Sequence, residues 1–340
     1  MSDLVVRTKG RAGRITLDRQ TALNALNHSM VTGIAEALDL FQSDDNVALV
    51  VIDGAGEKAF CAGGDIVMLY ETGKTNPEIG RSFWRDEYRL NARIARYPKP
   101  YVSILDGIVM GGGIGVGAHG SHRIVTERTV AAMPEVKIGF SPDVGGSSLL
   151  AHAPGHVGEY LAMTGGRMSG ADAIFAGFAD YFVPSARLRE LVAALEETGD
   201  PGVIADYAEE PAPSELAAHA AEIDAIFDGP DARTILARLA GTPFAEKTAN
   251  TIARNAPFSV VAALEAVRLA KRNPEIEPCL VNEYRFSHRV LEGHDLYEGI
   301  RALLIDKDNA PKWQPATVEG VDNAKVAAAY APLGAEELRL

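Results

Sequence analysis

The sequence has few cysteines and no excess of positive charge. Its 340 residues include only two cysteines, Cys61 and Cys279. Two are too few for a disulfide framework or a cysteine-based zinc cluster, and such usage is typical of a reducing compartment. The 33 Lys and Arg are outnumbered by 46 Asp and Glu, which gives a net charge of −13. The average field of this surface repels a polyanion, so we expect no nucleic-acid partner.

Long apolar runs are also missing. The most membrane-like stretch, residues 107–118, is uncharged but short and rich in glycine, whereas a helix that spans a bilayer needs about 20 apolar residues. The first residues show no basic region followed by an apolar segment, so we expect no secretory leader. These features predict a cytoplasmic protein that has no membrane partner.

The first half of the chain alternates between strand-like and helix-like patterns. Three segments rich in β-branched or alternating apolar residues predict strands: 14–18, 47–52 and 101–105. Between the first two, apolar residues recur at helical spacing at Met30, Ile34, Ala37, Leu38 and Phe41. This alternation is typical of a layered α/β fold.

After about residue 200 the strand signals stop. Helices are predicted over residues 215–227, 258–271 and 278–291. The bridge at residues 198–214 is rich in proline and acidic residues, which break helices. Since a chain of this length is expected to hold about two domains, we place them at residues 1–200, the core, and 201–340, a helical C-terminal region.

Two glycine-rich segments carry the densest chemical signal. Residues 60–65 read Phe-Cys-Ala-Gly-Gly-Asp, and residues 110–113 read Met-Gly-Gly-Gly. Each follows a strand-like run and precedes a predicted helix, where backbone N–H groups are unpaired. Paired N–H groups of this kind stabilise the oxyanion formed when a thioester carbonyl is enolised or attacked. Either segment alone is more typical of a tight turn, and the two together favour the oxyanion site.

Two acidic residues lie on proline- and glycine-rich loops. Glu135 follows Met-Pro, and Asp143 stands in the sequence Pro-Asp-Val-Gly-Gly of residues 142–146. Two neighbouring carboxylates divide acid and base roles when burial and mutual charge separate their pKa values. The alternative is simple turn formation or helix capping, for which Pro-Asp and Pro-Glu are common.

Other arrangements are weaker. Residues 113–118 match the dinucleotide pattern G-x-G-x-x-A, but no acidic residue ends a following strand at the required distance. The histidine pairs His119/His122 and His152/His156 have no evident third ligand, so we expect no metal. Cys61 has no visible partner base and is better explained as a small buried thiol than as a nucleophile. The G-x-S-x-G motif of serine hydrolases is absent.

Taken together, these motifs identify a resemblance to the crotonase, or enoyl-CoA hydratase/isomerase, superfamily. The resemblance runs through nearly the whole chain and is carried by residues 60–66, 107–113 and 133–139. Within the superfamily the chain is similar to the subfamily that hydrolyses 3-hydroxyisobutyryl-CoA, a step of valine catabolism, through residues 140–146, 292–295 and 304–313. The resemblance implies a crotonase-like spiral of ββα units with a helical C-terminal region. It also implies an acyl-CoA substrate, no separate cofactor, and a homo-oligomer that is a trimer or a dimer of trimers.

The resemblance also assigns roles to single residues. It implies that the backbone N–H groups of Gly64 and Gly112 form the oxyanion hole and that backbone groups near Ala62 contact the adenine of CoA. Glu135 stands at the position of the catalytic glutamate, which acts as general base or as nucleophile. Asp143 stands at the position of a second acid, which orients water or the 3-hydroxyl. Glu87 falls where a substrate-contacting glutamate is expected, although its charged neighbours favour a solvated helix face.

One departure from the hydratase pattern bears on the reaction. Hydratases carry a second glutamate 20 residues before the first, and that position here is Gly115. We therefore expect hydrolysis of a short 3-hydroxyacyl-CoA thioester. The main alternative is an enoyl-CoA isomerase or hydratase of the same fold, and a second is a non-catalytic acyl-CoA- or RNA-binding protein, which the acidic balance disfavours.

Overall fold

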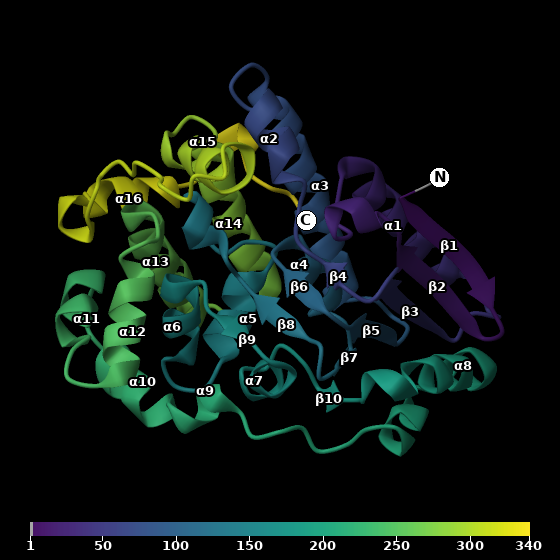
Figure 1. Ribbon diagram of the computed structural model, residues 1–340. Coiled ribbons are helices and arrows are strands. Elements are labelled where there is room, and N and C mark those ends of the chain that lie inside the picture. The colour runs from purple at the N-terminus through teal and green to yellow at the C-terminus, as the bar shows by residue number, and fades with distance from the viewer. Residues whose placement is uncertain (1–2) are drawn as a thin grey trace. The chain divides into compact units, whose positions relative to one another are not determined.

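The computed structural model describes residues 3–340 (Figure 1). Contacts divide the chain into two compact units that interleave along the sequence. The first unit holds the chain up to Gly64 together with Arg89–Ala132 and Met168–Ala217, and the second holds Asp65–Tyr88, Met133–Arg167 and Ala218–Leu340. One boundary falls inside helix α3 (Pro77–Ala95), so that helix contributes residues to both units.

A six-stranded sheet of order β1-β2-β3-β5-β7-β10 organises the first unit. The strands β1 and β2 form an antiparallel hairpin, and every later neighbour in the sheet is parallel. The central strand β3 reads Leu-Val-Val-Ile at its start with all four side chains buried, as expected for a strand covered on both faces. The strand bounds are Leu4–Lys9 (β1), Ala12–Leu17 (β2), Leu49–Gly54 (β3), Tyr101–Leu105 (β5), His122–Val125 (β7) and Tyr181–Phe182 (β10).

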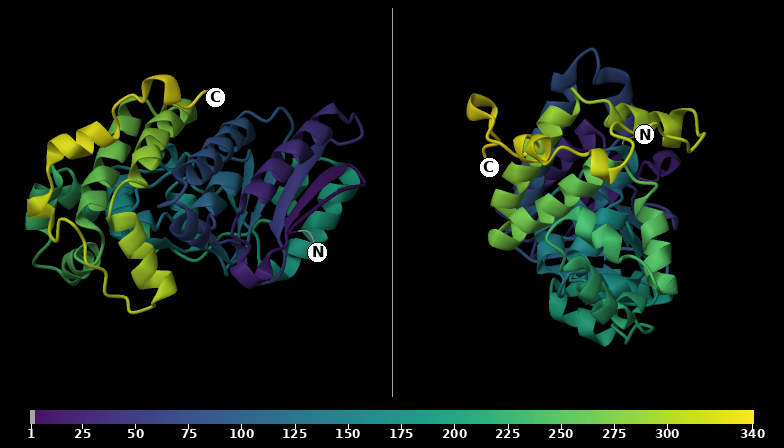
Figure 2. Two further views of the ribbon diagram at one scale, coloured as in Figure 1. Left: turned by 90° about the horizontal axis from the view of Figure 1, so that it is seen from above. Right: turned by 90° about the vertical axis from the view of Figure 1, so that its left-hand side faces the viewer.

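Helices α1 (His28–Ser43) and α8 (Leu188–Thr198) cover opposite faces of this sheet (Figure 2). The ring of Phe41 from α1 lies where a Cβ on Gly13 would be, whereas the neighbouring residue Ala12 packs with Leu191 and Leu195 of α8. Because successive residues of a strand face opposite ways, the two helices must lie on different faces. Helix α1 begins at a side-chain cap, in which Asn27 accepts a hydrogen bond from the N–H of Met30 at 2.9 Å.

A second, smaller sheet has the order β4-β6-β8-β9. Strands β4 and β6 are parallel, with Ala59 opposite Ile108 and Cys61 opposite Val109, and β6 is parallel to β8. Parallel strands end at the same edge of a sheet, so the chain segments that follow β4 and β6 leave side by side. The bounds are Ala59–Cys61 (β4), Ile108–Met110 (β6), Val130–Ala132 (β8) and Arg167–Met168 (β9), and a unit boundary falls inside β9. Helices α4 (Gly112–Gly117) and α7 (Gly170–Phe175) belong to the first unit.

The second unit is helical. Its longest helix after α3, α13 (Pro257–Arg272), starts with proline at the position where the missing N–H costs nothing, and it packs against α5, α6 and α14. Figure 1 shows α13 in green among its neighbours. The remaining helices are α2 (Ile66–Thr72), α5 (Gly146–His152), α6 (Val157–Thr164), α10 (Ala220–Phe227), α11 (Ala232–Arg238), α12 (Pro243–Ile252), α14 (Ile276–Val290), α15 (Asp295–Ile300) and α16 (Asn323–Ala329), with 3₁₀ turns that include η2 (Glu135–Ile138).

The expected elements compare with the structure as follows. The strand at residues 101–105 and the helix at 258–271 are confirmed within one residue. The helix expected over 215–227 is two helices, α9 (Glu215–Ala218) and α10, separated at His219. The helix expected to begin at Pro278 begins at Ile276, because proline is also tolerated inside the first turn, where N–H groups have no partner. The expected division at residue 200 stays a prediction, and the compact units follow other boundaries.

Candidate active site

The two glycine segments meet in the first unit, as the pairing of β4 with β6 requires. A Cβ built on Gly63 would lie 3.5 Å from the carbonyl oxygen of Met110 and 4.0 Å from the amide nitrogen of Gly112. Gly63 itself has φ of +120°, a conformation that residues with a side chain rarely adopt. The segments after β4 and β6 therefore approach each other backbone to backbone, which is the arrangement that an oxyanion hole from Gly64 and Gly112 needs.

Helix α4 packs equally closely on the first glycine segment. A Cβ on Gly113 would lie 2.3 Å from the carbonyl oxygen of Cys61, so no side chain fits there. Gly112 is the first residue of this helix, where backbone N–H groups have no intrahelical acceptor. Cys61 is fully buried and its thiol lies 3.5 Å from the Gly63 carbonyl oxygen. Ala62 is half-buried, and its N–H donates to the Leu23 carbonyl at 3.0 Å.

The predicted carboxylates lie in the second unit, and all three are buried. Glu87 is 2% exposed on α3, Glu135 is 5% exposed at the start of η2, and Asp143 is 6% exposed in the turn before α5. The charged neighbours of Glu87 favoured a solvated helix face, and that expectation is therefore wrong. Charged groups are costly to bury, and three buried acids in one unit indicate chemistry rather than packing.

Glu135 is held at a 3₁₀ turn that begins after Pro134 and ends at Gly139, whose φ is +77°. Its Oε2 has no hydrogen-bond partner among residues 3–340. Burial raises the pKa of Glu135 well above its usual value, and the nearby charge of Asp143 raises it further. A raised pKa makes the carboxylate a stronger base once it is ionised, and the protonated form can return a proton later, as acid–base catalysis requires.

Asp143 sits in a tight turn with a strained backbone. The next residue, Val144, has φ of +54°, which is unusual for a β-branched side chain. The Oδ2 atom of Asp143 accepts a hydrogen bond of 2.8 Å from the hydroxyl of Tyr88. Burial raises the pKa of Asp143 to about 8, with the charge of Glu283 acting in the same direction and the Tyr88 hydrogen bond opposing it.

Glu87 completes the predicted set. Its Oε1 has no hydrogen-bond partner within the described part of the chain. Burial raises the pKa of Glu87 well above the ordinary range, and the charge of Asp143 adds to this effect. Buried polar atoms are normally satisfied, so the free oxygens of Glu87 and Glu135 are candidates to bind a substrate or a water molecule.

A further buried carboxyl, which holds the turn after Asp143, was missed by the sequence analysis. Glu283, on α14, is 2% exposed and accepts hydrogen bonds from the N–H of Gly145 at 2.7 Å and from the N–H of Ser147 at 2.9 Å. Burial raises the pKa of Glu283 to about 7, although these hydrogen bonds act to lower it. The sequence does hold one signal for the burial of Glu283, because this residue lies between Leu280 and Ser287 on the buried stripe of α14.

Both histidines of the second pair contact other groups through Nδ1. His152 Nδ1 lies 2.8 Å from the Ser148 carbonyl oxygen, and His156 Nδ1 lies 3.2 Å from Glu159 Oε1. No group of three or more His, Cys, Asp or Glu side chains within residues 3–340 is arranged to hold a metal ion. Over the same range, no helix combines the length and the apolar character that crossing a bilayer requires.

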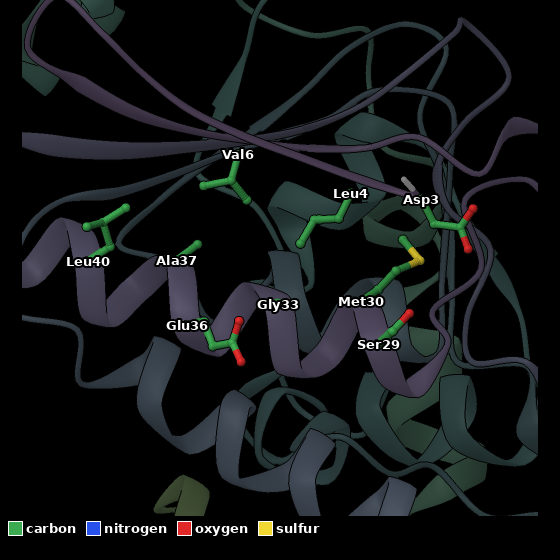
Figure 3. Close-up of a pocket in the computed structure, with 9 residues that line it drawn as sticks. All are labelled: Asp3, Leu4, Val6, Ser29, Met30, Gly33, Glu36, Ala37 and Leu40. Carbon is green, nitrogen blue, oxygen red and sulfur yellow. The ribbon is translucent and has the colours of Figure 1, made fainter. Parts of the chain in front are cut away.

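A groove in the first unit lies between β1 and α1 (Figure 3). Its volume is about 390 Å³, and its nine lining residues include the acids Asp3 and Glu36 and no basic residue. Phosphate groups are bound through cations and N–H donors, so this groove does not suit the phosphate end of CoA.

The comparison with known proteins identifies the class. A family model described as enoyl-CoA hydratase/isomerase matches residues 12–330. The chain belongs to the enoyl-CoA hydratase/isomerase family and has the crotonase fold, as expected from its motifs.

Two sets of similar proteins, curated relatives and solved structures, are more specific than the family model. The chain is 39% identical to 3-hydroxyisobutyryl-CoA hydrolase, mitochondrial, of Gallus gallus, over all of this chain and 91% of the relative. It is 40% identical to the protein of the same name from Xenopus laevis, over 97% and 89%. Among solved structures it is similar to a carnitinyl-CoA dehydratase from Mycobacterium thermoresistibile (TM-score 0.96, 48% identity, 100% and 99% covered). It is also similar to an enoyl-CoA hydratase from Rhodobacter sphaeroides 2.4.1 (TM-score 0.94, 45% identity, both chains fully covered).

These names correct one expectation. The curated relatives are named mitochondrial, so the expected cytoplasmic location is wrong. That expectation depended on the lack of a secretory leader and of a membrane-spanning run together with the low cysteine content, and none of these distinguishes one reducing compartment from another.

Proposed function

We propose that this protein hydrolyses the thioester bond of a short 3-hydroxyacyl-CoA, with 3-hydroxyisobutyryl-CoA as its substrate and 3-hydroxyisobutyrate and CoA as products. The observation that carries the proposal is the pairing of a buried Glu135 and Asp143 in a chain that has glycine at position 115. Hydration across a C=C bond uses a second glutamate at that position, and hydrolysis of a thioester does not. The relatives named 3-hydroxyisobutyryl-CoA hydrolase support the same reaction.

In this mechanism the N–H groups of Gly64 and Gly112 bind the thioester oxygen. Their hydrogen bonds strengthen as negative charge develops on that oxygen, which lowers the barrier to attack at the carbonyl carbon. Glu135 takes a proton from the attacking water, the new C–O bond forms, and the C–S bond then breaks. The sulfur leaves as the CoA thiol after it receives a proton, and the acyl group leaves as the carboxylic acid.

Glu135 has a second route as the nucleophile. Direct attack by its carboxylate would give a mixed anhydride and free CoA, and water would then hydrolyse the anhydride. A single turnover in H₂¹⁸O that leaves ¹⁸O in the Glu135 carboxyl identifies the anhydride route, because direct attack by water puts the label in the product alone. In both routes Asp143 orients the water or the substrate's 3-hydroxyl, and Glu87 contacts the substrate.

A hydratase or dehydratase is the second candidate, because the two solved structures described above carry such names. The two reactions are separated by one assay with two substrates. We expect free thiol to be released from (S)-3-hydroxyisobutyryl-CoA much faster than crotonyl-CoA is hydrated. Rapid hydration of crotonyl-CoA without thiol release would overturn the hydrolase proposal.

A further inference from the structure

A chain of buried hydroxyl groups runs from Asp143 to the backbone of α14. The hydroxyl of Tyr88 lies 2.8 Å from Asp143 Oδ2 and 2.7 Å from Ser287 Oγ. The Ser287 hydroxyl in turn lies 2.9 Å from the backbone carbonyl oxygen of Glu283 and donates to it. Tyr88 and Ser287 are fully buried, so water does not supply alternative partners.

The number of hydrogens in this chain is limited. A carbonyl oxygen only accepts, so the contact with Glu283 uses the single hydroxyl hydrogen of Ser287. The contact between the two hydroxyls then uses the hydrogen of Tyr88, and nothing remains for Tyr88 to donate to Asp143. All three contacts are hydrogen bonds at the same time only when Asp143 carries a proton on Oδ2 and donates it to Tyr88.

Ionised Asp143 requires the opposite direction. The carboxylate then accepts from Tyr88, and Tyr88 accepts from Ser287. The carbonyl of Glu283 then loses its hydrogen bond from the Ser287 hydroxyl. Because this carbonyl lies inside α14, helical N–H groups remain as its donors. Reversal therefore needs two hydroxyl rotations and no movement of the backbone.

We propose that Tyr88 and Ser287 are positioning residues for Asp143, whose hydroxyls reverse direction so that Oδ2 keeps a hydrogen bond whether Asp143 is protonated or ionised. The role of Asp143 in hydrolysis rests on the function proposed above, whereas the reversal rests on the contacts alone. Such a pair lets Asp143 gain and lose a proton during a reaction cycle while its oxygens stay in place, which preserves the geometry that catalysis needs.

Other ionisable groups also face Asp143. They are Glu87 on α3, Glu135 on η2 and Glu283 on α14, and each acts through the charge of a carboxylate in the same buried region. These charges favour protonated Asp143 but supply no hydrogen bond to Oδ2. The Tyr88 ring is packed edge-on against Tyr284, with centroids 6.2 Å apart, which holds its hydroxyl in place.

The two hydroxyls have opposite effects on the pKa of Asp143. Tyr88→Phe removes both the donor to the ionised carboxylate and the acceptor for protonated Asp143. Hydrogen bonds to charged groups are the stronger ones, so the ionised state loses more and the pKa should rise by about one unit. Ser287→Ala keeps that donor, but it removes two hydrogen bonds of the protonated arrangement, from Tyr88 to Ser287 and from Ser287 to the Glu283 carbonyl, and only one of the ionised arrangement, so the pKa should fall by roughly half a unit. A role in packing alone would not move the two values in opposite directions.

The test is a pH titration by infrared difference spectroscopy of the full chain without substrate. The carbonyl band of protonated Asp143 is assigned by its loss in Asp143→Asn, which separates it from the bands of the three glutamates. Tyr284→Phe is the matched control for Tyr88→Phe, because its hydroxyl pairs with Arg85 at 3.1 Å. Ser148→Ala is the control for Ser287→Ala, because the Ser148 hydroxyl donates to the Pro274 carbonyl at 2.7 Å.

We expect opposite shifts in the two test variants and no shift in the controls. Equal values in wild type and both test variants, or shifts in the same direction, would overturn the inference. The pH profile of kcat/KM for 3-hydroxyisobutyryl-CoA is measured in parallel. If the wild-type protein releases no CoA while the band shifts as expected, the proposed function fails and the hydroxyl reversal stands.

Discussion

The carboxylate of Glu283 accepts a hydrogen bond of 2.7 Å from the backbone N–H of Gly145, two residues after Asp143. Its other oxygen accepts from the N–H and the hydroxyl of Ser147, at 2.9 and 2.5 Å. Between these anchors and Asp143 lies Val144 with its positive φ. A backbone conformation of this kind costs on the order of 1–3 kcal/mol and persists only where the surroundings enforce it. Glu283 supplies that enforcement for the turn that carries Asp143.

We predict that Glu283→Ala lowers the stability of the protein substantially. The substitution leaves two buried N–H groups without an acceptor and creates a cavity, which together should cost about 2–5 kcal/mol and lower Tm by several degrees. Thermal unfolding followed by circular dichroism at pH 7 measures the change. The matched control is Glu292→Ala, whose side chain is 71% exposed and pairs only at the surface with Arg81, and we expect it to stay within about 0.5 kcal/mol of wild type. Equal Tm values for the two variants would contradict the role given to Glu283.

The missed residue shows where sequence analysis reaches its limit. Glu283 and Gly145 are 138 positions apart, and no local pattern predicts which distant backbone groups one carboxylate will meet. The burial of Glu87 was easier to infer from the sequence. Glu87 stands among Phe83, Trp84 and Tyr88, which are almost fully buried, and their spacing on α3 defines a buried stripe that includes Glu87. The charged residues Arg85 and Asp86 obscured that pattern.

Local features were predicted well where one physical effect dominates. Residues 101–105 are mostly apolar and became β5, which is buried throughout, and the helix expected over residues 258–271 became α13. The break at His219 was not predicted, because residues 215–227 keep a helical composition on both sides of it. Local patterns of glycine and proline pointed to the glycine segments, Glu135 and Asp143, whereas the hydroxyl pair at Tyr88 and Ser287 belongs to no short motif.

The second prediction concerns Glu135. Glu135→Gln keeps the shape of the side chain but removes the proton acceptor, so kcat for CoA release should fall about 10²–10⁴-fold. Substrate binding should survive, because the amide still fills the same space. Release of free thiol measures kcat, and calorimetric titration with a non-hydrolysable substrate analogue measures binding. Turnover close to that of wild type would place the chemistry on another residue.

The third prediction uses Asp143 to separate a hydrolase from an isomerase. An isomerase that moves a proton with Glu135 alone should tolerate Asp143→Asn. A hydrolase that needs this carboxyl to orient water or the 3-hydroxyl should lose more than tenfold in kcat/KM, which corresponds to about 1.4 kcal/mol of transition-state stabilisation. The measurement is paired with an unfolding curve. Unchanged hydrolysis in a folded variant would contradict the assigned role.

The last prediction concerns the pH dependence of stability. The pKa of Asp143 is raised to about 8 in the folded protein from a usual value of 3.8. Between these two values the folded state holds a proton that the unfolded state has released, so the free energy of unfolding falls as the pH rises through this window. Asparagine does not titrate, and it also removes the charge that raises the pKa values of Glu87 and Glu135.

The stability of Asp143→Asn relative to wild type should therefore increase between pH 5 and pH 8, by about 1 kcal/mol or more. Comparing each variant with wild type at the same pH cancels groups that titrate identically in both proteins. Denaturant unfolding at pH 5, 6, 7 and 8 gives the required free energies. As a control, Asp228→Asn replaces an exposed acid whose pKa is lowered by Arg238, and its difference from wild type should not increase over this range. A constant or decreasing difference for Asp143→Asn would show that Asp143 does not hold its proton in the folded protein, because only a raised pKa makes ionisation oppose folding in this window.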